Sequence, residues 1–139
     1  KKEVVEKDEK EKSIRKVLNL GHTFAHAYEA TIGYNKGLNH GEAVLLGILS
    51  AVEFSRRKNI LKKNDYNQII EHLKKLNYYD LNRYFKSKDI SKIIFYMKQD
   101  KKNKDSKINL ILLKSISKPV LNKSFEENNI RSFLKNLIY

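Results

Sequence analysis

Hydrophobic residues recur at helical spacing over most of the chain. Residues 13–30 carry this pattern, and residues 41–57 form a nearly continuous apolar run typical of a buried helix. Two further amphipathic helices are predicted around residues 69–76 and 90–97, the second with Asp89 as its N-cap. Most of the chain is therefore predicted to be helical.

The last third of the chain departs from this pattern. Residues 108–113 form a short apolar run that reads as a strand, with residues 120–121 as a possible partner strand. Ser124 followed by Glu127 forms a capping-box pattern ahead of the amphipathic residues 130–137. The expected fold is therefore mainly α, with one minor pair of β-strands and a helix at the C-terminal end.

Composition narrows the class of protein. The 139 residues, 40% of them hydrophobic, suit one modest core, so we expect a single helical domain over residues 1–139. The chain has no cysteine, which leaves histidine and carboxylate groups as possible metal ligands. There is no long uncharged apolar run and no leader pattern, which predicts a cytoplasmic protein without a membrane partner. The first residues, KKEVVEKDEKEK, have no helix cap before them and indicate a fragment.

The formal net charge of +13 raises the question of a nucleic-acid partner. Most of the basic residues are lysines, and the excess between Arg56 and Lys107 is scattered over several predicted helices and a loop. A phosphate-reading surface would gather such charges into one stripe. We therefore interpret the charge as a solvated, lysine-rich surface and expect no nucleic-acid partner.

The segment NLGHTFAHAYE, residues 19–29, places functional groups on one face of the first predicted helix. With about 100° of rotation per residue, four side chains fall within a stripe about 60° wide: Arg15, Asn19, His22 and His26. Guanidinium, amide and imidazole groups bind anions, ligate metals or move protons near neutral pH, whereas an ordinary surface stripe carries Lys, Glu and Gln. A solvated face with two incidental histidines is the alternative.

A third histidine can approach this stripe from the next helix. His40 follows a glycine-bearing loop and opens the sequence HGEAV, so it lies at a helix entrance that can fold back beside the first helix. Histidines from two elements are a common zinc arrangement, and a catalytic zinc needs a third protein ligand. Glu29 lies one turn past His26, and Glu42 is better placed to cap the helix. Neither is a convincing third ligand.

These residues belong to a longer stretch that resembles the C-terminal domain of 3-dehydroquinate synthase. The family signature is similar to the segments SIRKVLNLGHTFAHAYE and LNHGEAV, and MKQDKKNKDSKINLILL resembles its Asp-Lys-Lys loop with the following strand. The resemblance covers essentially the whole chain. Ser13 and Ala25 depart from it, because the family usually has glycine at both places, and Ala25 could crowd a close helix contact.

The resemblance implies a role for each matching residue. His22 and His40 match the metal-binding histidines, and His26 matches the catalytic histidine that hydrogen-bonds the substrate and assists proton movement. The residues that match those holding the anionic substrate are Lys1, Arg15, Asn19 and, on the phosphate side, Lys101 or Lys102. The cofactor-binding residues stay unknown, since this chain has no match for them.

The resemblance also implies a reaction. In the family, a seven-carbon keto-acid sugar phosphate is converted into 3-dehydroquinate and inorganic phosphate with the help of NAD and Zn²⁺, or Co²⁺ in its place. An N-terminal domain binds NAD and supplies a glutamate as the third metal ligand, and a homodimer is expected. This chain has no Gly-x-Gly-x-x-Gly motif, so we expect it to lack that domain and to be inactive alone.

Two alternatives stay open. Another sugar phosphate cyclase could share this scaffold, although Lys1 and Arg15 favour a keto-acid substrate. A non-catalytic remnant of the helical domain is the other, and the joint presence of Arg15, Asn19 and the three histidines argues against it.

Overall fold

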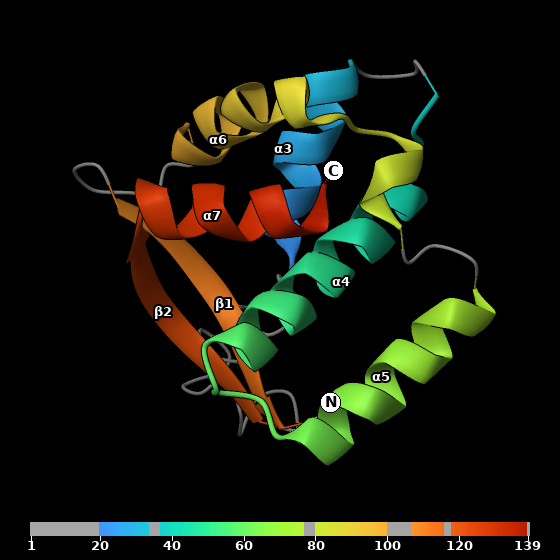
Figure 1. Cartoon of the computed structure of the whole chain (residues 1–139), viewed down its shortest axis with the longest axis vertical. Helices are drawn as coiled ribbons and strands as arrows, with labels where there is room; N and C mark the ends of the chain where they lie inside the picture. The colour runs from blue at the N-terminus through green and yellow to red at the C-terminus, as the bar shows by residue number, and fades with distance from the viewer. Residues whose placement is uncertain (1–19, 34–36, 77–79, 100–106, 116–117, 139) are drawn as a thin grey trace, which may run out of the picture.

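The computed structural model describes residues 20–138 apart from residues 34–36, 77–79, 100–106 and 116–117 (Figure 1). This part of the chain is mainly helical with one antiparallel strand pair, which confirms the predicted fold class. None of its helices is long and apolar enough to cross a membrane. In chain order the elements are α3 (His22–Ile32), α4 (His40–Arg57), α5 (Lys63–Lys75), the 3₁₀ turns η1 (Leu81–Arg83) and η2 (Ser87–Asp89), α6 (Ile90–Lys98), β1 (Lys107–Ser115), β2 (Lys118–Glu126) and α7 (Glu127–Leu137).

The core lies between α3, α4, α6, α7 and the strand pair, while α5 runs alongside α4 at the edge of the molecule (Figure 1). Aromatic rings connect these elements. The Phe54 ring packs edge-on against Phe133, with 5.0 Å between centroids, and Phe24 approaches the same ring at 5.9 Å. Three helices therefore meet at Phe133, and they fix α3 and α4 relative to each other.

Helix α4 is also fastened to the strand pair by a buried hydroxyl. Ser55 Oγ donates to the Ala51 carbonyl oxygen at 2.7 Å and accepts the backbone N–H of Leu113 at 2.9 Å. Buried polar groups are stable only when they are paired, and this one satisfies a strand amide from a helix. The apolar run predicted as a buried helix is α4. It is held by α3 on one side and by β1 on the other.

Two local predictions need correction. Of the helix expected over residues 13–30, residues 13–19 lie outside the described residues, Leu20 and Gly21 form a turn, and α3 begins at His22. The expected capping box is absent: Ser124 lies within β2, where its hydroxyl contacts Asn109, and Glu126 is the N-cap of α7. Asp89 is the N-cap residue of α6, as predicted, although its carboxylate accepts the Lys86 N–H at 2.8 Å and makes no capping hydrogen bond to α6.

Candidate metal and substrate site

The start of α3 is fixed by a close approach between two glycines. Gly21 has φ 79°, a left-handed conformation that side chains rarely tolerate, and it forms the N-cap of α3. A Cβ on Gly21 would lie 2.4 Å from the carbonyl carbon of Gly47 in α4. The two helices therefore touch at this point, and His22 follows directly as the first residue of α3.

His22 and His26 lie one turn apart on α3 with their rings stacked. Their centroids are 5.4 Å apart and the ring planes are inclined by 30°. His26 is exposed, whereas Phe24, Ala27 and Tyr28 on the other side of the helix are buried. The two imidazoles thus share one polar face, as the helical spacing predicts.

The remaining residues expected to bind substrate, Lys1, Arg15, Asn19, Lys101 and Lys102, lie outside the described residues. Arg15 and Asn19 fall on the stripe of His22 only if one continuous helix runs through residues 15–26. The chain turns at Gly21, so helical spacing does not carry across residues 20–21. Their assignment as substrate-binding residues now depends on the family resemblance alone.

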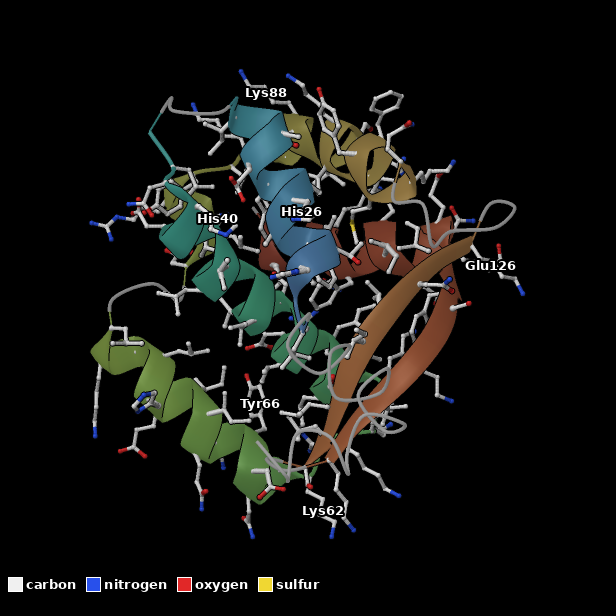
Figure 2. The ribbon with its side chains drawn as sticks, turned by 180° about the vertical axis from the view of Figure 1, so that it is seen from behind. His26, His40, Lys62, Tyr66, Lys88 and Glu126 are labelled. Atoms are coloured by element: carbon white, nitrogen blue, oxygen red, sulfur yellow. The ribbon has the colours of Figure 1, made fainter. Side chains whose placement is uncertain are left out.

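His40 is the first residue of α4, and its side chain is 67% exposed. Figure 2 shows it on the same side of the molecule as His26, on the neighbouring helix. The turn that precedes it is held by a capping box, in which Asn39 Oδ1 accepts the Glu42 N–H at 2.8 Å and Glu42 Oε1 accepts the Asn39 N–H at 3.1 Å. The helix entrance that presents His40 is therefore rigidly defined.

Both carboxylates that sequence analysis weighed as third ligands have structural partners. Glu42 caps α4, as expected, and its second oxygen accepts the Tyr84 hydroxyl at 2.9 Å. Glu29 lies on α3 and is only 8% exposed, and its Oε1 is 2.8 Å from His40 Nδ1. Sequence reasoning missed this contact because it depends on the path of the loop that returns the chain from α3 to α4.

The donors fit part of a metal site. No group of three His, Cys, Asp or Glu side chains suited to a metal ion occurs among the described residues. Since Glu29 occupies His40 Nδ1, the Nε2 atom is the nitrogen of His40 left for a metal. Two imidazoles from adjacent helices suit Zn²⁺ or Co²⁺, and further donors would have to come from elsewhere.

Comparison with known proteins finds relatives of this chain in one family. The model of the 3-dehydroquinate synthase C-terminal family matches residues 1–103. Over 136 residues the chain is 52% identical to 3-dehydroquinate synthase of Pelagibacter ubique (strain HTCC1062), a match that covers 97% of this chain and 37% of the relative. The corresponding synthase of Coxiella burnetii (strain Dugway 5J108-111) is 38% identical over 138 residues, a match that covers 98% of this chain and 37% of the relative. The chain thus spans little more than a third of these relatives.

The solved structures show the same fold in a more distant protein. A crystal structure of 2-deoxy-scyllo-inosose synthase complexed with carbaglucose-6-phosphate, NAD⁺ and Co²⁺ is similar with a TM-score of 0.69 and 23% sequence identity. That match covers 86% of this chain and 33% of the other. On the family match over residues 1–103, the chain belongs to the 3-dehydroquinate synthase C-terminal family.

Proposed function

We propose that residues 1–139 form the helical metal- and substrate-binding domain of a 3-dehydroquinate synthase. The enzyme would convert 3-deoxy-D-arabino-heptulosonate 7-phosphate into 3-dehydroquinate and phosphate, a step of the shikimate pathway that leads to aromatic amino acids. The observation that carries this proposal is the 52% identity to a 3-dehydroquinate synthase over 97% of the chain. The three histidines brought to the adjoining faces of α3 and α4 support it.

His22 and His40 are the proposed metal ligands of this chain. When bound, Zn²⁺ or Co²⁺ would polarise the substrate hydroxyl that is oxidised, and NAD⁺ would accept the hydride. His40 offers Nε2, because its Nδ1 faces Glu29. His22 directly follows Gly21, whose backbone closely approaches Gly47 of α4.

His26 is the proposed catalytic residue. Its exposed ring lies one turn beyond His22 and so can contact a substrate held beside the metal ligands. An imidazole accepts or donates a proton near neutral pH, which suits it to general acid–base chemistry at the substrate oxygen. His26 is therefore assigned a role in proton transfer and in hydrogen bonding the substrate.

The charged ends of the substrate are assigned to residues that match the family. A substrate with a carboxylate and a phosphate needs several fixed cations and hydrogen-bond donors. By resemblance these are Lys1, Arg15 and Asn19, with Lys101 or Lys102 on the phosphate side. An N-terminal NAD-binding domain would complete the site, and we further propose a homodimer located in the cytoplasm.

An exchange of domains tests this function. The test uses a chimaeric protein, called the joined enzyme below. In it, residues 1–139 replace the matching third of the P. ubique synthase, and the P. ubique synthase supplies the N-terminal part. We expect it to release phosphate from the seven-carbon keto-acid sugar phosphate and to form 3-dehydroquinate. The intact P. ubique enzyme is the positive control.

Two results would contradict the proposal. Turnover of a hexose 6-phosphate in preference to the keto-acid substrate would indicate another sugar phosphate cyclase. A folded, NAD-binding joined enzyme without activity on either substrate would indicate a non-catalytic helical domain.

A further inference from the structure

Glu29 is a buried carboxylate that no sequence-based assignment uses. It lies on α3 three residues after His26 and seven after His22, so it continues the polar face that carries both imidazoles. Acidic side chains are rarely this buried unless they are paired. In the described part of the chain its partner is His40 Nδ1, at 2.8 Å from Oε1.

This contact bears on which ring nitrogen of His40 carries the hydrogen atom. A carboxylate in its ionised form can only accept hydrogen bonds, so its contact with His40 favours the form of the ring that carries a proton on Nδ1. In neutral imidazole the other nitrogen, Nε2, then holds a lone pair. A metal ion requires this lone pair on its histidine ligand. The hydrogen bond also sets the orientation of the His40 ring, whose side chain is 67% exposed.

We propose that Glu29 is a positioning residue of the metal site, which holds His40 in the Nδ1–H tautomer and aims Nε2 at the metal. This inference rests on the proposed function, because it takes His40 as a metal ligand. It assigns Glu29 to the hydrogen-bonding partner of a ligand and not to the third ligand itself. In the complete site, Glu29 then acts through His40 without touching metal or substrate.

A simpler role for Glu29 would be to clamp the loop between α3 and α4. Glu29→Gln separates the two roles because it keeps the shape of the side chain and one hydrogen bond to the ring. The amide can accept from Nδ1–H or donate to Nδ1, so it holds the loop but no longer selects the tautomer. A clamp would tolerate this change, whereas a positioning residue would not.

The first measurement is the tautomer of His40 in the ¹⁵N-labelled chain of residues 1–139. Ring nitrogen shifts, recorded at a pH where the imidazole is neutral, distinguish the Nδ1–H from the Nε2–H form. We expect His40 in the Nδ1–H form in the unaltered chain, a mixture in Glu29→Gln, and mostly the Nε2–H form in Glu29→Ala.

The second measurement follows the same ring signals during titration with ZnCl₂. We expect Glu29→Gln and Glu29→Ala to weaken the apparent zinc affinity, the alanine variant by about 10–100-fold. Glu53→Gln is the matched control, since Glu53 is a carboxylate on α4 that accepts the Tyr66 hydroxyl at 2.5 Å and does not touch His40. It should leave the affinity unchanged.

The outcomes separate this inference from the function on which it rests. If His40→Ala abolishes the zinc response but both Glu29 variants keep the unaltered tautomer and affinity, the positioning role is wrong and the metal site stands. If zinc shifts neither the His22 nor the His40 signals in the unaltered chain, or if His22→Ala and His40→Ala both bind zinc as well as the unaltered chain does, the metal assignment fails and the role of Glu29 fails with it.

Discussion

At the scale of single residues, the Tyr28 hydroxyl is a polar group placed inside the core. Tyr28 is fully buried, its oxygen is 2.5 Å from Ser50 Oγ, and burial raises the pKa of the Tyr28 hydroxyl above its ordinary value. Ser50 Oγ donates to the Leu46 carbonyl oxygen at 2.8 Å, so the Tyr28 O–H is the donor to Ser50. This chain of hydrogen bonds joins α3 to α4 beneath the polar face of α3.

We therefore expect Tyr28→Phe to lower the free energy of unfolding by about 1 kcal/mol, the usual net value of one buried hydrogen bond. Ser50→Ala should cost more, because it leaves the Tyr28 hydroxyl buried without its acceptor. Urea unfolding of the two single variants and the double variant measures both effects. Equal and additive losses would show that the pair is not coupled.

The residue scale also shows where sequence reasoning stopped. Helical spacing predicted that His22 and His26 share a face, because both lie on one uninterrupted helix. The same arithmetic gave Glu29 a direction but not a partner, since the contact to His40 depends on where α4 begins relative to α3. Contacts between neighbouring turns were predictable, and contacts across a loop were not.

At the scale of elements, the α3–α4 crossing sets the distance between the two helices that carry the histidines. A Cβ on Gly47 would lie 2.3 Å from the Gly21 carbonyl oxygen and 2.9 Å from Ala25 Cβ. Ala25, which stands where the family usually has glycine, is accommodated because Gly47 has no side chain. The crowding expected from Ala25 is thus relieved by the facing helix.

Gly47→Ala should therefore destabilise the protein, by about 1–3 kcal/mol, because backbone atoms cannot move aside as a flexible side chain can. Gly41→Ala on the same helix is the control, since its Cβ would meet nothing closer than Asn39 Oδ1 at 3.4 Å. That change should be neutral or stabilising by up to about 1 kcal/mol. Thermal or urea unfolding compares the two, and equal effects would contradict the proposed tight crossing.

The elements that sequence analysis misjudged have a common cause. Periodicity continued through Gly21, but a left-handed residue was needed where the backbone meets Gly47, and that requirement comes from tertiary packing. Ser124 matched a cap motif, yet pairing with β1 extended β2 to Glu126 and took that serine into the sheet. Hydrophobic patterns located the elements, whereas their ends were decided by partners distant in sequence.

At the scale of the whole molecule, the described residues provide two proposed metal ligands and no cluster of three. We therefore expect residues 1–139 alone to bind Zn²⁺ far more weakly than the joined enzyme, in which the N-terminal part can add the missing donor. Calorimetry on the two proteins makes the comparison. Tight one-to-one binding by residues 1–139 alone would mean that this chain completes the site itself.

The division of labour between neighbouring histidines is the central claim about the molecule. In the joined enzyme, His22→Ala should lose zinc and turnover together, because it removes a ligand. His26→Ala should keep its zinc, because His26 is assigned to the substrate and not to the metal. Its turnover should fall by about 10²–10⁴-fold, the usual size of a lost general acid–base contribution.

Metal analysis combined with steady-state turnover of these two variants is the most direct test. The predicted result is that His26→Ala keeps its zinc but loses turnover, whereas His22→Ala loses both zinc and turnover. Zinc lost equally from both variants, or near-full turnover in His26→Ala, would contradict the roles assigned to this face of α3.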